Sequence, residues 1–170
     1  MAEGIVNRVA NSALVSIDLE ELYQPGERVL LDIKDQLFQG LILREKDFRE
    51  YVKNHDWQQY EGEFVAITCT ADAIVPTWAF MLLASKLEPV AKHFVFGDLE
   101  ALETKLFTDA IAQLNLDDYT DKPVVIKGCS DKPVPVSAYV ELVRVLRPKV
   151  RTIMYGEPCS TVPVYKKPRK

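Results

Sequence analysis

The sequence predicts an α/β fold, a three-layer sandwich in which a central, mostly parallel sheet of four or five strands carries helices on both faces. Short, continuous apolar runs alternate with segments of helical period from residue 64 to residue 155. The connections between successive runs are long enough to return to the same edge of a sheet. This alternation is typical of parallel βαβ units.

The part of the chain before residue 64 predicts at least one strand and one helix. Residues 28–43 contain two apolar runs. They fit either two strands around a tight turn or one strand followed by irregular chain. A helix is predicted over residues 46–57 because four side chains follow at helical spacing, namely Phe48, Tyr51, Val52 and His55.

Four further strands are predicted over residues 64–68, 93–96, 123–127 and 151–155. The helices between them have recognisable ends. Pro76 suits the first position of a helix, Asp98 can cap the next one, and Pro148 ends the last.

Length and composition predict one α/β domain over residues 1–163, with a lead-in at 1–27 and a basic tail at 164–170. The chain has 170 residues, 48% of them hydrophobic, and no internal repeat or flexible linker is expected to divide it. A net charge of −4 disfavours nucleic acid as a partner. No export signal or membrane-spanning run is expected, so we predict a cytoplasmic protein.

All three cysteines follow predicted strands. Ligands of parallel sheets bind outside the carboxyl ends of the strands, where loops from different strands meet. Thiolates are soft ligands, so cysteines gathered there predict a site for a metal ion or an iron–sulfur cluster. The candidate ligands are Cys69, Cys129 and Cys159, and the carboxylates near them are Asp72, Asp98, Asp131 and Glu157.

Two other interpretations of the cysteines stay open. None of them belongs to a C-x-x-C pair, the spacing typical of zinc and iron–sulfur sites, so all three fit equally well as small buried hydrophobic residues. Alternatively, Cys129 is a catalytic nucleophile. It lies between Lys127 and Lys132 and ahead of a helix, and both features favour a thiolate. The two lysines fit solvent-exposed positions just as well.

Four stretches match a known pattern. They are residues 43–49 (LREKDFR), 72–78 (DAIVPTW), 127–135 (KGCSDKPVP) and 156–166 (GEPCSTVPVYK). Through them the chain resembles the DUF2480 family of uncharacterised bacterial proteins, found mainly in Bacteroidetes, over nearly its whole length. The resemblance implies a cytoplasmic protein whose genes lie near iron–sulfur cluster assembly genes of the SUF type. It favours a thiol role for Cys129 and Cys159 over a role in packing. Cys69 lies outside the two longest motifs, so its assignment to the site is less secure than theirs.

The sequence therefore predicts an accessory factor of iron–sulfur or sulfur metabolism that binds a metal, a cluster or a sulfane sulfur at the carboxyl ends of the strands. Iron–sulfur assembly proteins are the expected partners. A small thiol-dependent enzyme using Cys129 and a structural protein without a ligand are the alternatives. His55 and His93 receive no role, because neither is predicted to lie at this edge.

Overall fold

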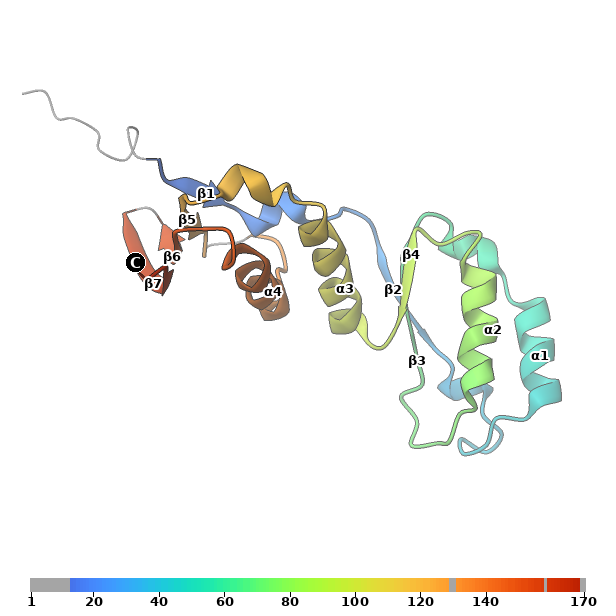
Figure 1. Ribbon diagram of the computed structural model, residues 1–170. Helices are drawn as coiled ribbons and strands as arrows, with labels where there is room; N and C mark the ends of the chain where they lie inside the picture. Colours follow the sequence, from blue (N-terminus) through green and yellow to red (C-terminus); the bar gives the residue numbers. More distant parts are fainter. Residues whose placement is uncertain (1–12, 129–130, 158, 169–170) are drawn as a thin grey trace, which may run out of the picture. The chain divides into compact units, whose positions relative to one another are not determined.

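The computed structural model describes residues 13–128, 131–157 and 159–168 (Figure 1). The chain divides into two compact units. Unit 1 contains the described residues up to Tyr23 and from Leu106 onward, and unit 2 contains residues 24–105. The division falls within one helix, α3 (Leu99–Ala112), so this helix contributes residues to both units.

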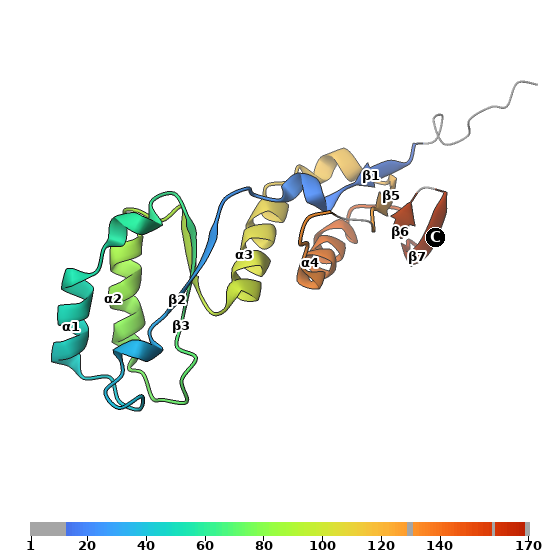
Figure 2. The same ribbon diagram turned by 180° about the vertical axis from the view of Figure 1, so that it is seen from behind.

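Unit 2 is built on a parallel sheet in the order β2 (Arg28–Asp32), β3 (Phe64–Thr68) and β4 (His93–Phe96). Helices α1 (Glu45–Asn54) and α2 (Thr77–Leu87) lie on the same side of this sheet (Figures 1 and 2). Alternate residues of the central strand β3 meet these helices. The core between sheet and helices contains Leu31, Phe48, Val52, Val65, Ile67, Leu83 and Leu87.

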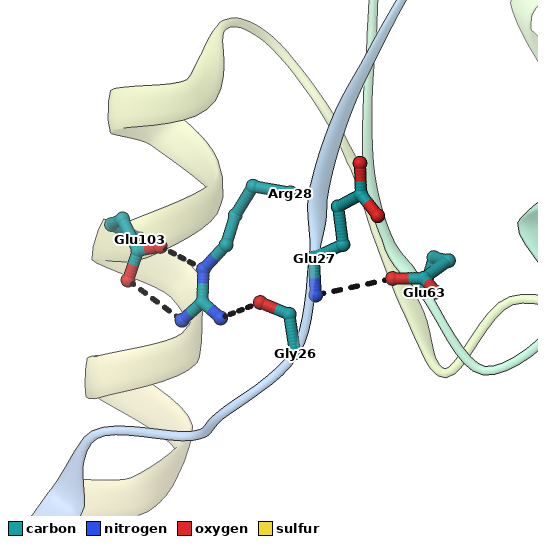
Figure 3. Close-up of polar contacts among 5 residues, drawn as sticks. All are labelled: Gly26, Glu27, Arg28, Glu63 and Glu103. Carbon is teal, nitrogen blue, oxygen red and sulfur yellow. Dashed lines mark hydrogen bonds and ion pairs between the residues drawn. The ribbon is translucent and has the colours of Figure 1, made fainter.

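The opposite face of the unit 2 sheet carries an ion pair to α3 (Figure 3). The Arg28 guanidinium contacts both carboxylate oxygens of Glu103, and both side chains are more than four-fifths buried. Arg28 also donates to the Gly26 carbonyl at 2.6 Å and lies 4.9 Å from the centroid of the Phe64 ring. The first turns of α3 are therefore tied to β2.

Unit 1 is built on a four-stranded sheet in the order β1 (Val15–Ile17), β5 (Pro123–Ile126), β6 (Thr152–Glu157) and β7 (Ser160–Lys166). The first three strands are parallel, and β7 returns antiparallel to β6. Helix α4 (Val136–Leu146) connects β5 to β6. The core of this unit contains Ile17, Phe107, Ile111, Val124, Ile126, Leu142 and Ile153.

Four short 3-10 helices complete the described chain. They are η1 (Leu19–Leu22), η2 (Lys34–Gln36), η3 (Trp57–Tyr60) and η4 (Leu116–Tyr119). Residues 28–43 thus form one strand followed by irregular chain, the second of the two alternatives predicted for them. No helix in the described ranges has the length and apolar composition needed to cross a membrane.

The α/β class is confirmed, and the unit 1 sheet is mixed but mostly parallel. The strands are divided between two sheets, however, where one had been expected. Local periodicity predicts that a segment is a strand but not which strand it joins, because pairing depends on distant hydrogen bonds. Strand β1 lies inside the expected lead-in, and β7 extends into the expected tail to Lys166.

The two units repeat one structural pattern, so the expectation of no internal repeat was wrong. Residues 43–98 align with residues 102–157 without a gap, at the constant separation of 59 positions that joins Phe48 to Phe107. Both halves contain, in order, a helix, a 3-10 helix, a strand, a helix and a strand. Equivalent buried residues include Val52 and Ile111, Val65 and Val124, Ile67 and Ile126, Ala79 and Ala138, Leu83 and Leu142, and Leu87 and Leu146.

The turns of the two halves are equivalent as well. Gly62 and Asp121 precede β3 and β5 with φ angles of 72° and 54°. Gly97 and Gly156 lie at equivalent positions, each following the fourth residue of its strand, and have φ angles of 138° and 122°. The repeat escapes a search for periodicity because most of its shared residues lie at buried positions and turns. The cysteines do not share it, because Cys69 aligns with Gly128 and Cys129 aligns with Thr70.

Candidate functional site

The carboxyl ends of β1, β5 and β6 form one edge of the unit 1 sheet, which we call the unit 1 rim. Ile17 is paired with Ile126, and Ile126 with Tyr155, so the parallel pairing of the three strands ends at one level, beyond which β6 continues to Glu157. The Lys127 amide donates to the Ile17 carbonyl at 2.9 Å and extends the ladder by one residue. Side chains that follow the three strands therefore meet at this rim.

An ion pair joins two of these strand ends. The Lys127 ammonium lies 3.2 Å from Asp18 Oδ2, while Asp18 Oδ1 accepts a hydrogen bond from the Glu20 amide at 3.0 Å. The hydrogen bond to Asp18 is the main reason that the pKa of Lys127 is raised, and the nearby charges of Glu157 and Glu21 add to it. The charge of Lys127 is thus already compensated inside the rim.

Glu20 holds the loop between β5 and α4. Its Oε1 accepts hydrogen bonds from the backbone amides of Asp131 and Lys132, the second at 2.9 Å. The Lys132 ammonium lies 5.6 Å from the centroid of the Tyr23 ring, close enough for a cation–π contact. A segment near the start of the described chain therefore positions this loop.

Tyr155 and Gly128 contact one another across the rim. The Tyr155 hydroxyl donates to the Gly128 carbonyl at 3.4 Å. A Cβ atom at Gly128 would lie 2.8 Å from the tyrosine ring, so only glycine allows this approach. The unit 2 counterparts of these residues are Phe96 and Cys69, which cannot make the same contact.

The three cysteines belong to two different sheets. Cys159 is exposed and lies in the connection between β6 and β7 of unit 1. Cys69 follows β3 of unit 2, where it is partly buried against the hydrophobic core. Cys129 lies outside the described residues. The expectation that all three share one edge rested on a single sheet, and no group of three potential metal ligands occurs in the part of the chain that the structure describes.

The predicted carboxylates are divided in the same way. Asp131 and Glu157 lie at the unit 1 rim. In unit 2, Asp72 follows β3, and Asp98 caps α3 by accepting a hydrogen bond from the Ala101 amide at 2.8 Å. Asp98 therefore has the capping role predicted from the sequence.

Unit 2 has a related rim built around Asp32. Its carboxylate accepts hydrogen bonds from the Thr70 hydroxyl and the Thr70 amide, the second at 3.1 Å. Burial alone would raise the pKa of Asp32, but the hydrogen bonds from Thr70 and Lys34 outweigh burial and lower it. Asp32 stands where Asp18 stands in unit 1, and both accept a hydrogen bond from the amide two residues later.

The geometry of the unit 1 rim weakens two arguments for an activated Cys129. Helix α4 begins at Val136, seven positions after Cys129, and a helix dipole acts mainly within its first turn. The Lys127 charge is already paired with Asp18. Sequence reasoning missed Asp18, Glu20 and Tyr155, because the partners of Asp18 and Glu20 are more than a hundred residues away in the chain.

The chain was compared with known proteins and families. A family model described as "Protein of unknown function (DUF2480)" matches residues 3–167. The chain belongs to the DUF2480 family. No curated protein and no solved structure matches it. Membership in DUF2480 therefore supports the resemblance found in the sequence and leaves the activity to be argued from the site.

Proposed function

We propose that this DUF2480 protein is a non-catalytic accessory factor of iron–sulfur or sulfur metabolism, which binds a soft metal ion, a cluster or a sulfane sulfur through Cys129 and Cys159. The observation that carries the proposal is the pairing of β5 with β6, in which Ile126 lies opposite Tyr155. The two cysteine-containing motifs therefore leave the same edge of one sheet.

The covalent chain allows both thiols to reach a common ligand. Cys129 follows Lys127 by two residues, and Cys159 follows Glu157 by two. An extended residue spans at most about 3.6 Å, and neighbouring strands lie about 4.8 Å apart. Two thiolates would supply soft ligands, and Asp131 and Glu157 would add carboxylate oxygens near them.

Surface exposure supports a role in binding over a role in packing. Free cysteines are among the most often buried residues in proteins. Cys159 is exposed. An exposed thiol two residues after Glu157 fits a binding site better than a hydrophobic core.

Binding is favoured over nucleophilic catalysis by the charges of the rim. A nucleophilic cysteine needs a neighbouring uncompensated cation, a base or a helix N-terminus to stabilise its thiolate. Lys127 is paired with Asp18, and the rim also contains Glu20 and Glu157. A bound cation would instead stabilise the thiolates in these acidic surroundings.

Metal titration of single-cysteine variants tests the proposal. Cd²⁺ added to the reduced protein without oxygen should produce thiolate–metal absorption that saturates at one equivalent per chain. Cys129→Ser and Cys159→Ser should each weaken binding by about 100-fold, since each removes one of two thiolates. Cys69→Ser is the matched control and should bind like the wild type, because Cys69 belongs to unit 2.

Protein purified without oxygen tests the natural ligand. Elemental analysis should find metal or labile sulfur in the wild type and in Cys69→Ser, but not in Cys129→Ser. Iodoacetamide should then label Cys129 faster after a chelator or a reductant has removed the ligand. An unoccupied protein that gives no thiolate–metal absorption with Cd²⁺ would contradict the proposal.

A further inference from the structure

Strand β4 ends the unit 2 sheet, and no strand of the described chain pairs with its outer side. The Gly97 amide donates to the Ile67 carbonyl at 2.9 Å. Because backbone groups alternate in direction along a strand, His93 and Val95 also direct their backbone groups toward β3. The backbone groups of Phe94 and Phe96 then point away from the sheet. An uncovered edge of this kind is a template for another strand.

The repeat shows what covers the equivalent edge in unit 1. Strand β6 corresponds to β4, and its outer side is paired with β7. Ile153 and Tyr155, the counterparts of Phe94 and Phe96, lie opposite Tyr165 and Val162 of β7. Unit 2 has no equivalent of β7 in the described chain, because α3 follows β4 directly.

The apolar groove beside the edge is also duplicated. In unit 1 a groove of about 280 Å³ is lined by Ile126, Tyr139, Val140, Val143, Tyr155 and, from β7, Val164. In unit 2 a groove of about 450 Å³ is lined by counterparts of five of these residues, among them Phe80, Met81 and Phe96, and also by Thr77, Phe94 and Val95. The edge-to-face pair of Phe80 and Phe96, with centroids 4.9 Å apart, matches that of Tyr139 and Tyr155 at 5.8 Å.

The aromatic residue beside the strand edge is the more exposed in unit 2. Phe96 is 69% exposed, whereas its counterpart Tyr155 beside β7 is 40% exposed; Met81 and its counterpart Val140 are alike, at 67% and 66%. An aromatic side chain left in water next to unpaired backbone groups marks a surface that another chain covers. We propose that the outer edge of β4 pairs antiparallel with β4 of a second copy of this chain and forms a two-fold homodimer with one continuous sheet.

The distribution of backbone groups and charges points to a second copy. Phe94 and Phe96 both direct their backbone groups outward, so hydrogen bonding allows a register in which Phe94 lies opposite Phe96 of the partner subunit. Val95 then lies on the two-fold axis. In this register Lys92, before the strand, lies opposite Asp98 of the partner subunit, after it. A two-fold interface must be self-complementary, and this charge arrangement satisfies the requirement.

Cysteine cross-linking tests the register directly. Residues on the axis form a pair without hydrogen bonds, whose Cα atoms lie about 4.5 Å apart, within the range that a disulfide spans. Val95→Cys should therefore give a covalent dimer under mild oxidation, with two copies of the substituted peptide joined by a disulfide and identified by mass spectrometry. Met154→Cys is the matched control. It occupies the same position in unit 1, where β7 already covers the edge, and should give no such cross-linked peptide.

Sedimentation measures the interface without cross-linking. The wild type should reach twice its monomer mass of 19.3 kDa at micromolar concentration. Phe96→Asp should raise the dimer dissociation constant by about 100-fold, because it places an unpaired charge in an apolar interface. Val162→Asp, on the exposed strand β7, should leave it unchanged. A wild type that stays monomeric, or a dimer in which Val95→Cys does not cross-link, would overturn the proposal.

Discussion

At the scale of single residues, the most informative pair is Phe48 and Phe107. Both are fully buried, one in each core, at equivalent positions of the repeat. Each ring belongs to the core cluster that also contains buried residues of a strand, β3 for Phe48 and β5 for Phe107. The two positions therefore offer the same substitution in two separate cores.

Phe48→Ala and Phe107→Ala should each lower the free energy of unfolding by about 3–5 kcal/mol, since each removes a buried ring and leaves a cavity. Urea unfolding followed by circular dichroism measures the loss. Phe38→Ala, at a 41% exposed position, is the control and should cost much less. A loss below about 1 kcal/mol, on the order of a surface substitution, would show that the site is not a packed core.

His55 makes the stability of unit 2 depend on pH. Its Nε2 lies 2.8 Å from the Tyr60 hydroxyl, and its ring contacts Tyr51 and Trp57. Burial lowers the pKa of His55, and the charge of Asp56 only partly opposes this effect. Burial, with smaller effects of Tyr51 and Asp56, raises the pKa of Tyr60 to about 12.

Because the pKa of His55 is lower in the folded state, the unfolded chain binds its proton first. The stability that neutral His55 contributes is complete above its unfolded pKa of about 6.5 and is lost as the pH falls through the folded value. His55→Gln should lose less stability than the wild type between about pH 7.5 and pH 5.5, because it removes this titration. Parallel losses in the two proteins would contradict the assignment.

At the scale of elements, the repeat predicts which glycines are essential. Gly156 has a φ angle of 122°, and a Cβ atom there would lie 2.6 Å from the Ser160 carbonyl oxygen. Gly62 has a φ angle of 72° but no atom within 4 Å of the Cβ position, and its counterpart Asp121 adopts a similar conformation. The same kind of substitution should therefore have different costs at the two sites.

Gly156→Ala should lower the free energy of unfolding by about 1–3 kcal/mol, through a strained backbone and a clash with the β6–β7 turn. Gly62→Asp should cost less than about 1 kcal/mol, because an aspartate already occupies the equivalent left-handed position. Thermal unfolding of both variants beside the wild type gives the comparison. Equal losses would mean that the turns of the two halves are not equivalent.

At the scale of the whole molecule, the division into two units with separate cores decides how the protein opens. Each core contains residues from one unit only. Regions with separate cores open with separate free energies, which amide hydrogen exchange resolves segment by segment.

Phe48→Ala should speed amide exchange in β3 and β4 by about 100-fold or more, because this factor corresponds to the expected loss of free energy of unfolding. Strands β5 and β6 should stay protected. Phe107→Ala should have the reverse effect. Exchange measured by mass spectrometry on both variants makes each the control for the other. A uniform increase over all four strands would show that the two units unfold together.

The sequence by itself determined the α/β class and the position of most elements. The bounds of β3 and β4 were predicted to the residue, because short apolar runs flanked by polar residues and glycine identify strands locally. It also identified the two cysteine motifs and the family. Strand β1, with three residues, and β7, with Pro163 inside it, carry too weak a local pattern to be recognised.

Only the tertiary structure decided which strands pair and what surrounds the predicted site. Asp18 meets Lys127 across 109 positions of the chain, and such a contact leaves no periodic pattern in the sequence. The repeat became visible once buried positions could be compared, since residues facing solvent have diverged in type. The same comparison shows that β7 covers the outer edge of β6, whereas in the described ranges no strand pairs with the equivalent edge of β4. Hydrogen bonding between strands depends on chain topology and not on local propensity.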